Sequence, residues 1–408
     1  MKSFSIAAIF ELIAKLGIFL LSLIVARHFG PEDFGLWTLA QTMIFFVIIV
    51  VEFASQQTGV RTLILNIDRT PQDLQKALNT IVSFRIIGLS FCVLIGISFF
   101  LSGTLDFILL SSLIVYGLGH FFNFDFLYRA LGYQLYAAVQ NFILIFITVL
   151  IVFILSLLES NISDVILARS FVILLIFIMF FKYAKKKYLK VTPLNRQVIS
   201  DLTENVQPNI SAFLYVMAGA FFARVFSGAN VFVVEYNLNN LDLGLFSAVS
   251  LFYIGFITIK GVITTLLYPN LCEKYNNGNY YEFVFKITKL SLLFSLVILY
   301  PISFYGDVLI KFIFGASYVT TESVATFKIY IYICIALSVG LLIPNSLHVT
   351  GRSKEFFIIT LICALLCIGI SFLLIPTLGI IGAAYATLTV ELLVLISSGF
   401  YFLKGAKN

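Results

Sequence analysis

Residues 137–158 read AAVQNFILIFITVLIVFILSLL, an apolar run that contains no charged residue. A helix needs roughly 20 such residues to cross a hydrocarbon core about 30 Å thick. Runs of similar length and character recur along the whole chain, and short connectors separate them. This repeated pattern predicts an all-α polytopic membrane protein.

Twelve apolar runs are expected to span the membrane, with eleven or thirteen as the alternative counts. The predicted spans are residues 5–26, 36–59, 80–101, 107–127, 137–158, 165–184, 206–234, 244–268, 283–305, 322–343, 355–376 and 380–403.

The composition excludes an enzyme with an aqueous domain. Of the 408 residues, 61% are hydrophobic and only 11% are charged, and the mean hydropathy is +1.05. The connectors between the runs are too short to form a catalytic domain. The sequence contains no G-x-x-x-x-G-K-[ST] loop, and its five cysteines lack the spacing of a metal or redox site. We therefore expect a function that is performed inside or across a bilayer.

The distribution of basic residues predicts the orientation. Cytoplasmic loops of membrane proteins retain Lys and Arg. If the amino terminus is cytoplasmic, only Arg27 and Lys311 fall in outer connectors. Both termini are therefore expected inside. The inner connectors then hold Lys2, Arg61, Arg69, Lys76, Arg129, Lys182, Lys185, Lys186, Lys187, Lys190, Arg196, Lys274, Arg352, Lys354, Lys404 and Lys407.

A weak internal repeat divides the chain into two halves. Residues 33–40, DFGLWTLA, resemble residues 242–249, DLGLFSAV. Six spans separate the two segments, so equivalent helices run in the same direction, as in parallel repeats. We predict a six-helix lobe over residues 1–184, a basic cytoplasmic linker over 185–205 and a second six-helix lobe over 206–408. Two such bundles around a central cavity are typical of alternating-access transporters.

Basic side chains inside the predicted spans are the candidate cargo-binding groups. An ionised side chain costs roughly 2.5–3.5 kcal/mol at the bilayer centre, so it normally faces a cavity or a partner. Lys15, Arg224 and Lys260 lie near mid-span, and Arg85 and Arg169 lie closer to span ends. Because arginine binds phosphate oxygens in pairs, this basic excess favours an anionic cargo.

Three acidic residues inside the spans are candidates for ion coupling: Glu11, Glu52 and Glu391. Each could carry H+ or Na+. For Glu52 and Glu391 the alternative is interhelical hydrogen bonding in the protonated form. Glu11 and Lys15 have the favourable i,i+4 order, so the alternative for them is mutual neutralisation that only stabilises the bundle.

Four segments resemble a known family of transporters. Residues 24–37, IVARHFGPEDFGLW, are similar to the first loop of Wzx-type O-antigen flippases, which belong to the multidrug/oligosaccharidyl-lipid/polysaccharide exporter (MOP) superfamily. Residues 313–318 (IFGASY), 348–354 (HVTGRSK) and 375–387 (IPTLGIIGAAYAT) resemble the C-terminal halves of these flippases. These are loop and packing signatures, and their order and spacing carry the resemblance.

The resemblance implies twelve helices in two lobes around a central cavity. It also implies a cargo of undecaprenyl-diphosphate-linked oligosaccharide, moved from the cytoplasmic to the outer leaflet of a bacterial inner membrane for O antigen or another surface polysaccharide. Polysaccharide polymerase and chain-length regulator proteins are the implied partners. The five cationic residues match no family motif, so they are chosen by their depth in the spans.

Two other functions remain as alternatives. The first is a drug or metabolite cation antiporter of the same superfamily. The second is a lipid-modifying membrane enzyme, which would need a large outer loop or clustered acidic and histidine residues at one interface. The sequence shows neither feature, so a transporter without enzymatic activity is the main prediction.

Overall fold

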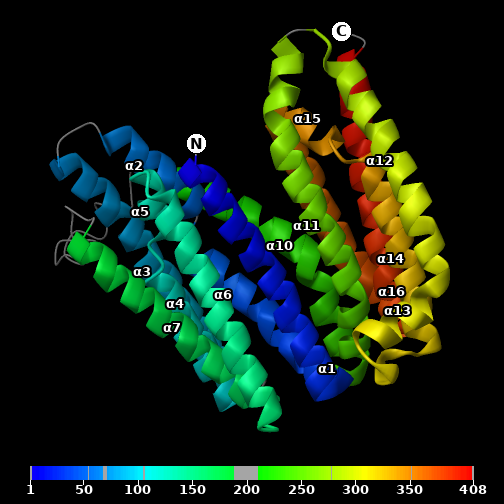
Figure 1. The fold of residues 1–408 in the computed structure, drawn as a ribbon, viewed down its shortest axis with the longest axis horizontal. Coiled ribbons are helices and arrows are strands. Elements are labelled where there is room, and N and C mark those ends of the chain that lie inside the picture. Colours follow the sequence, from blue (N-terminus) through cyan, green and yellow to red (C-terminus); the bar gives the residue numbers. More distant parts are fainter. Residues whose placement is uncertain are drawn as a thin grey trace. The chain divides into compact units, whose positions relative to one another are not determined.

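The computed structural model describes residues 2–53, 55–67, 71–103, 106–187, 210–276, 278–350 and 352–406 (Figure 1). Within these ranges the regular structure is helical and no strand occurs. The predicted all-α class is therefore confirmed. Of the predicted linker 185–205, only residues 185–187 lie within the described residues.

Two sets of helices follow one another along the chain. The first set is α1 (Lys2–Glu52), the π-helix η1 (Ser55–Gly59), α2 (Val60–Ile67), α3 (Pro71–Leu101), α4 (Phe107–Phe121), α5 (Asp125–Ala130), α6 (Gln134–Leu157) and α7 (Ile162–Lys187). The second set is α10 (Ile210–Asn237), α11 (Asn240–Asn276), α12 (Tyr280–Ile302), η2 (Ser303–Tyr305), α13 (Gly306–Ile313), η3 (Ala316–Tyr318), α14 (Thr321–Val339), α15 (Ile343–Val349) and α16 (Ser353–Ala406).

The described helices account for all twelve predicted spans. Nine stretches of the described residues are long and apolar enough to cross a membrane. Two of them, Ile9–Glu52 and Lys354–Lys404, contain a backbone break at Gly30 (φ 82°) and Gly379 (φ 61°), so each holds two predicted spans. Glycine occupies both breaks because residues with a side chain rarely adopt positive φ. The helix α10 covers the remaining span, and the chain is a multi-pass membrane protein.

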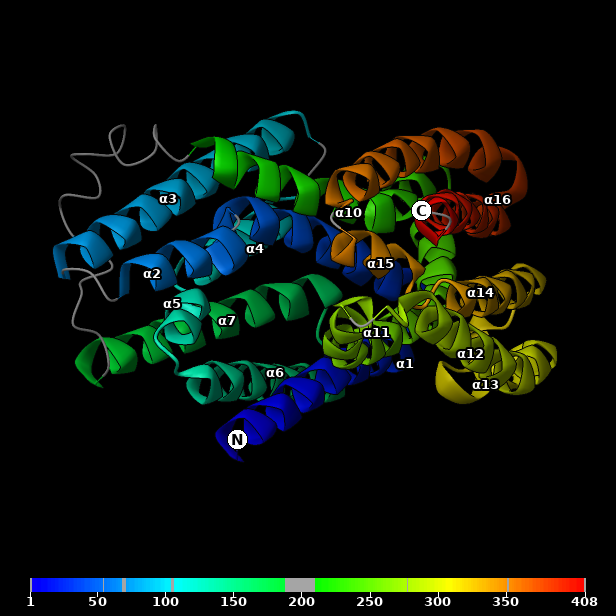
Figure 2. The same cartoon turned by 90° about the horizontal axis from the view of Figure 1, so that it is seen from above.

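The chain divides into two compact units. Unit 1 comprises residues 1–25 and 40–221, and unit 2 comprises residues 26–39 and 222–408. In unit 1, α4 packs against α3 and α7, and α7 also packs against α6, as Figures 1 and 2 show. In unit 2, α14 packs against α11, α12 and α16. Residues 26–39, from the N-terminal half of the sequence, thus belong to the unit that contains most of the C-terminal half.

The repeated segments meet in unit 2 through their glycines. A methyl group on Gly35 would overlap the carbonyl oxygen of Asn240, and one on Gly244 would overlap the carbonyl oxygen of Pro31. Pro31 and Asn240 are equivalent by the same offset that aligns Gly35 with Gly244. The two close approaches are therefore related by the internal repeat, as the two halves of an isologous contact are. The hydroxyl group of Tyr318 fastens this region further by donating to the carbonyl of Ala26 (2.8 Å).

Candidate functional site

A break in the first long helix positions the buried carboxylate of Glu52. The sequence predicts one continuous span over residues 36–59, but α1 ends at Glu52 and Phe53 adopts a left-handed conformation (φ 43°). The π-helix Ser55–Gly59 follows. Short π-helical segments are frequent at functional sites. The break is thus the first structural sign that Glu52 is more than a packing residue.

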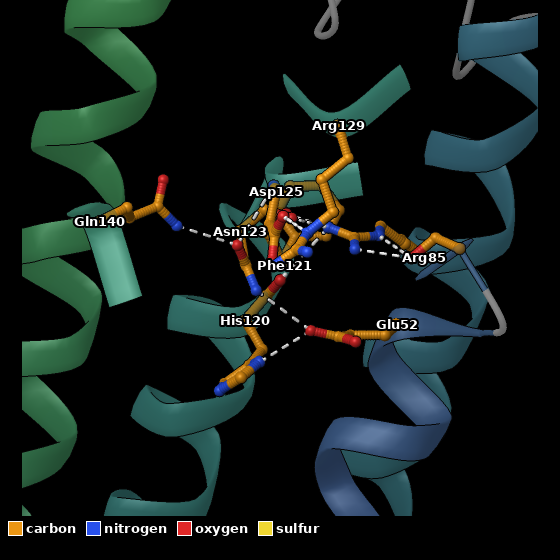
Figure 3. A network of polar contacts seen from close by, with 9 residues as sticks. Glu52, Arg85, His120, Phe121, Asn123, Asp125, Arg129 and Gln140 are labelled. Carbon is orange, nitrogen blue, oxygen red and sulfur yellow. Dashed lines mark hydrogen bonds and ion pairs between the residues drawn. The ribbon is translucent and has the colours of Figure 1, made fainter. Parts of the chain in front are cut away.

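The carboxylate of Glu52 contacts the end of α4. Its Oε1 lies 3.0 Å from Nδ1 of His120 and accepts a hydrogen bond of 3.2 Å from the side-chain amide of Asn123, as Figure 3 shows. The ring of His120 stacks on Tyr116, with centroids 4.9 Å apart, and meets the ring of Phe177 edge-on. Both polar partners of Glu52 are therefore held by packed side chains, which is how buried polar groups keep a fixed geometry.

The guanidinium group of Arg85, from α3, joins the π-helix to the end of α4. It donates to the hydroxyl oxygen of Ser55 through Nε (3.0 Å) and Nη2 (2.6 Å), and to the carbonyl oxygen of Asn123 through Nη1 (2.6 Å). Further bonds of 3.3 Å reach the carbonyls of His120 and Phe121. Arg85 therefore satisfies carbonyl groups that the end of α4 leaves without helical partners. Its side chain is 0% exposed, so binding of cargo by Arg85 stays a prediction that requires this network to open.

A chain of ion pairs continues from this point towards the surface. Arg129 binds Asp125 in the same short helix, and its Nη2 lies 2.6 Å from Oε1 of Glu11 in α1. The amide nitrogen of Asp125 donates to Oδ1 of Asn123 (3.2 Å). Glu11 thus pairs with a distant arginine, whereas Lys15, its expected i,i+4 neighbour, is exposed.

These contacts make one connected set of side chains, which we call the Glu52 network. Charges from three parts of the chain that lie far apart in the sequence meet in it, and it lies wholly within unit 1. Its members are Glu11, Glu52, Ser55, Arg85, His120, Asn123, Asp125 and Arg129 (Figure 3).

Arg169 lies beside the Glu52 network. It is buried in α7, and its guanidinium carbon lies 5.7 Å from the centroid of the Tyr116 ring, the same ring that stacks on His120. Such a cation–π contact is worth about 2 kcal/mol or more when it is desolvated. The structure therefore brings Arg85, Arg169 and Glu52 into one region of unit 1.

In unit 2 the structure brings together two other predicted residues. The hydroxyl group of Tyr253, in α11, donates to Oε1 of Glu391, in α16 (2.5 Å). Lys260, also in α11, lies within electrostatic reach of this carboxylate and is half-buried. We call Tyr253, Lys260 and Glu391 the Glu391 cluster.

A neutral group of hydrogen bonds lies elsewhere in unit 2. The side-chain amide of Asn230, in α10, donates to the carbonyl of Ala383 (3.1 Å) and to the hydroxyl oxygen of Thr387 (2.8 Å). Its Oδ1 accepts from the hydroxyl group of Ser371 (2.5 Å). Arg224 lies in the same helix and is half-buried.

Sequence reasoning missed several residues of these sites. It placed His120 at a span end, as an interfacial residue, and it did not consider Asn123, Asn230 or Tyr253. An asparagine within an apolar run was the available signal, because a buried amide requires partners. Among the residues that the structure describes, no three His, Cys, Asp or Glu side chains are grouped as metal ligands would be.

Comparison with known proteins places this geometry in a family of folds. No family model and no curated protein sequence matches the chain. The lipid II flippase MurJ, in an inward closed conformation, superposes with a TM-score of 0.73 at 17% identity, over 98% of this chain and 87% of that chain. The chain therefore has the MOP transporter fold.

Two multidrug transporters of the MATE family share the same fold. An inward-facing MATE transporter of the MOP superfamily gives a TM-score of 0.62 at 13% identity, over 98% of this chain and 97% of that chain. The Vibrio cholerae MATE transporter VcmN gives 0.61 at 13% identity, over 100% and 98% of the two chains. At such identities the comparison establishes the fold and leaves the cargo open.

Proposed function

We propose that this protein is a flippase for lipid-linked oligosaccharide. The similarity to the lipid II flippase MurJ carries the proposal, because its TM-score of 0.73 exceeds the values of 0.62 and 0.61 for the two MATE transporters. The residues quoted for the Wzx resemblance support the same cargo class. The cargo is an undecaprenyl-diphosphate-linked repeat unit of O antigen or another surface polysaccharide.

The distribution of basic side chains supports an anionic head group as cargo. A diphosphate with several sugars cannot cross hydrocarbon unaided, whereas a polyprenyl tail can stay in the lipid. Lys15 is exposed in α1, and Arg224 and Lys260 are half-buried in unit 2. Cations within membrane spans normally face a cavity or a partner, so these three residues are the proposed head-group ligands. Arg85 and Arg169 are proposed to act only after the contacts of the Glu52 network open.

The proposed transport cycle is alternating access by the lobes at residues 1–184 and 206–408. The head group enters from the cytoplasmic face of a bacterial inner membrane and leaves at the outer leaflet, while both termini stay cytoplasmic. Such a cycle requires cargo or a coupling ion to bind the two states differently. Glu11, Glu52 and Glu391 are the proposed sites for coupling to H+ or Na+, and no enzymatic step is proposed.

Deletion of the gene tests the cargo. Cells without the protein should accumulate lipid-linked oligosaccharide in the cytoplasmic leaflet, and the full chain should restore export. Arg224→Gln and Lys260→Gln should each lower export roughly tenfold or more, the equivalent of about 1.4 kcal/mol or more. Lys289→Gln removes an exposed cation near a span end and serves as the matched control. Unchanged export in both variants, at equal membrane abundance, would remove these residues from the head-group site.

A drug or metabolite cation antiporter is the second candidate, and the similarity to MATE transporters favours it. The deletion strain separates the two candidates. Altered tolerance of cationic drugs, with normal distribution of lipid-linked oligosaccharide between the leaflets, would favour the antiporter.

A further inference from the structure

The charges of the Glu52 network do not balance. It contains three carboxylates, from Glu11, Glu52 and Asp125, but only two guanidinium groups, from Arg85 and Arg129. Arginine stays protonated in proteins, so one negative charge is left over when His120 is neutral. An unpaired charge inside a membrane protein is expensive. One additional proton would make the network neutral.

His120 is placed to share that proton with Glu52. Its Nδ1 lies 3.0 Å from Oε1 of Glu52, within hydrogen-bonding distance, and the side chains are only 11% and 13% exposed. Histidine is the side chain whose ordinary charge change falls between about pH 5 and 8. We propose that Glu52 and His120 form a proton-binding site that holds one proton between the carboxylate and the imidazole. The proposal deepens the proposed function, on which it rests, by naming the proton as the coupling ion.

The network provides a route for the proton between the surface and this site. The side chains of Arg129 and Glu11 are 36% and 33% exposed, whereas that of Asp125 is only 7% exposed. Asp125 is joined to Asn123 by a hydrogen bond, and Asn123 donates to Glu52. Exposure therefore falls along a continuous series of polar contacts that ends at the proton site. Arg129 lies in a connector predicted to be cytoplasmic.

The proton site is coupled to the break after α1. Arg85 holds Ser55 of the π-helix and the carbonyl of Asn123 at the same time. A proton on the Glu52–His120 pair changes the charge that Arg85 faces, so it changes how strongly the π-helix and the end of α4 are held together. Because Glu52 is the last residue of α1, this change acts directly on the long helix.

The other groups that face the pair come from four elements. Tyr116 of α4 and Phe177 of α7 contact the imidazole through their rings. Arg85 of α3 and Asp125 of α5 lie within electrostatic reach of Glu52, and Arg169 of α7 lies over Tyr116. Of these groups only Asp125 is a carboxylate, and it is bound to Arg129. Glu52 and His120 are therefore the pair from which one proton can be taken and returned.

Histidine-selective nitrogen NMR and infrared spectroscopy of the full chain in lipid nanodiscs test the site. The sequence contains three histidines, so three signals are expected, and His120→Gln assigns one of them. Between roughly pH 5 and 9 the His120 signal should titrate together with a carboxylic-acid band in the infrared difference spectrum. Glu52→Gln should abolish that band and shift the midpoint of the His120 titration. Glu391→Gln, which alters a buried carboxylate of unit 2, should leave both signals unchanged.

A His120 signal that does not change with pH, or a pH-dependent band that survives in Glu52→Gln, would overturn the proposal. The infrared spectrum of the unmodified protein tests the site even if a variant fails to fold, because a spectrum without any titrating carboxylic-acid band would exclude it. These measurements need no cargo, so they separate the two ideas. A protein that passes them but does not move lipid-linked oligosaccharide would refute the flippase and retain the proton site. Normal export with no titrating pair would do the reverse.

Discussion

The Glu52 network and the Glu391 cluster hold a buried carboxylate in two different ways. In unit 1 the carboxylate of Glu52 is surrounded by charged groups from α3, α4 and α5, and the contacts continue to half-exposed residues. In unit 2 the carboxylate of Glu391 accepts a hydrogen bond from one tyrosine, with one lysine nearby. The comparison teaches that one unit compensates charge with charge over a long path, and the other does so locally.

The largest loss of stability is expected when the ionic arrangement of unit 1 loses its central cation. Arg85→Met leaves Glu52 without its nearest guanidinium and removes the donors to Ser55 and to the end of α4. Removal of one partner from a buried ionic arrangement costs about 3–5 kcal/mol. Thermal unfolding in detergent measures this loss, with Lys311→Met, an exposed cation of unit 2, as control. Equal melting temperatures for the two variants would contradict a structural role of Arg85.

A smaller but substantial loss is expected at the contact between the repeated segments. Gly35→Ala places a methyl group against the backbone of Asn240, so a main chain must shift, at a cost of about 1–3 kcal/mol. Gly255→Ala in α11 meets no neighbouring atom within 4 Å and serves as the control. The control should stabilise the protein by up to about 1 kcal/mol, because alanine favours helix. If both variants unfold at the same temperature, the close approach has no energetic importance.

In the Glu391 cluster a single hydrogen bond is at stake, so the expected loss is smaller again. Tyr253→Phe removes the hydroxyl donor to Glu391 and keeps the ring that stacks on Tyr330. Interhelical hydrogen bonds in membrane proteins contribute on average about 0.6 kcal/mol and at most about 1.7 kcal/mol. Chemical unfolding measures the change, with Tyr332→Phe at an exposed position as control. A loss as large as that of Arg85→Met would show that unit 2 also depends on an extended network.

The smallest effect on stability is expected for Lys15→Gln. The side chain is exposed, and Glu11 is already paired with Arg129, so stability should change by less than about 0.5 kcal/mol. Export should nevertheless fall if Lys15 binds the head group. Paired measurements of melting temperature and export check both statements. A clear loss of stability would instead show that Lys15 pairs within the bundle.

The sequence predicted the local fold well and the partners of the charged residues less well. All twelve spans, 36–59 and 206–234 among them, coincide with helices, because the length of an apolar run is enough to predict a span. The end of α1 at Glu52 was missed, since the left-handed turn at Phe53 has no glycine to signal it. The assignments of Lys15, Arg224 and Lys260 to a cargo site stay predictions.

Sequence alone determined that the chain crosses a membrane about twelve times as helices, and where its buried charges lie along those helices. This was possible because a bilayer imposes the same length and polarity on every span, whatever its neighbours are. Only the tertiary structure decided that Glu11 pairs with Arg129 and that Glu52 faces His120. Such pairs depend on how each helix is rotated about its axis and on contacts between residues far apart in the sequence, which hydropathy does not encode.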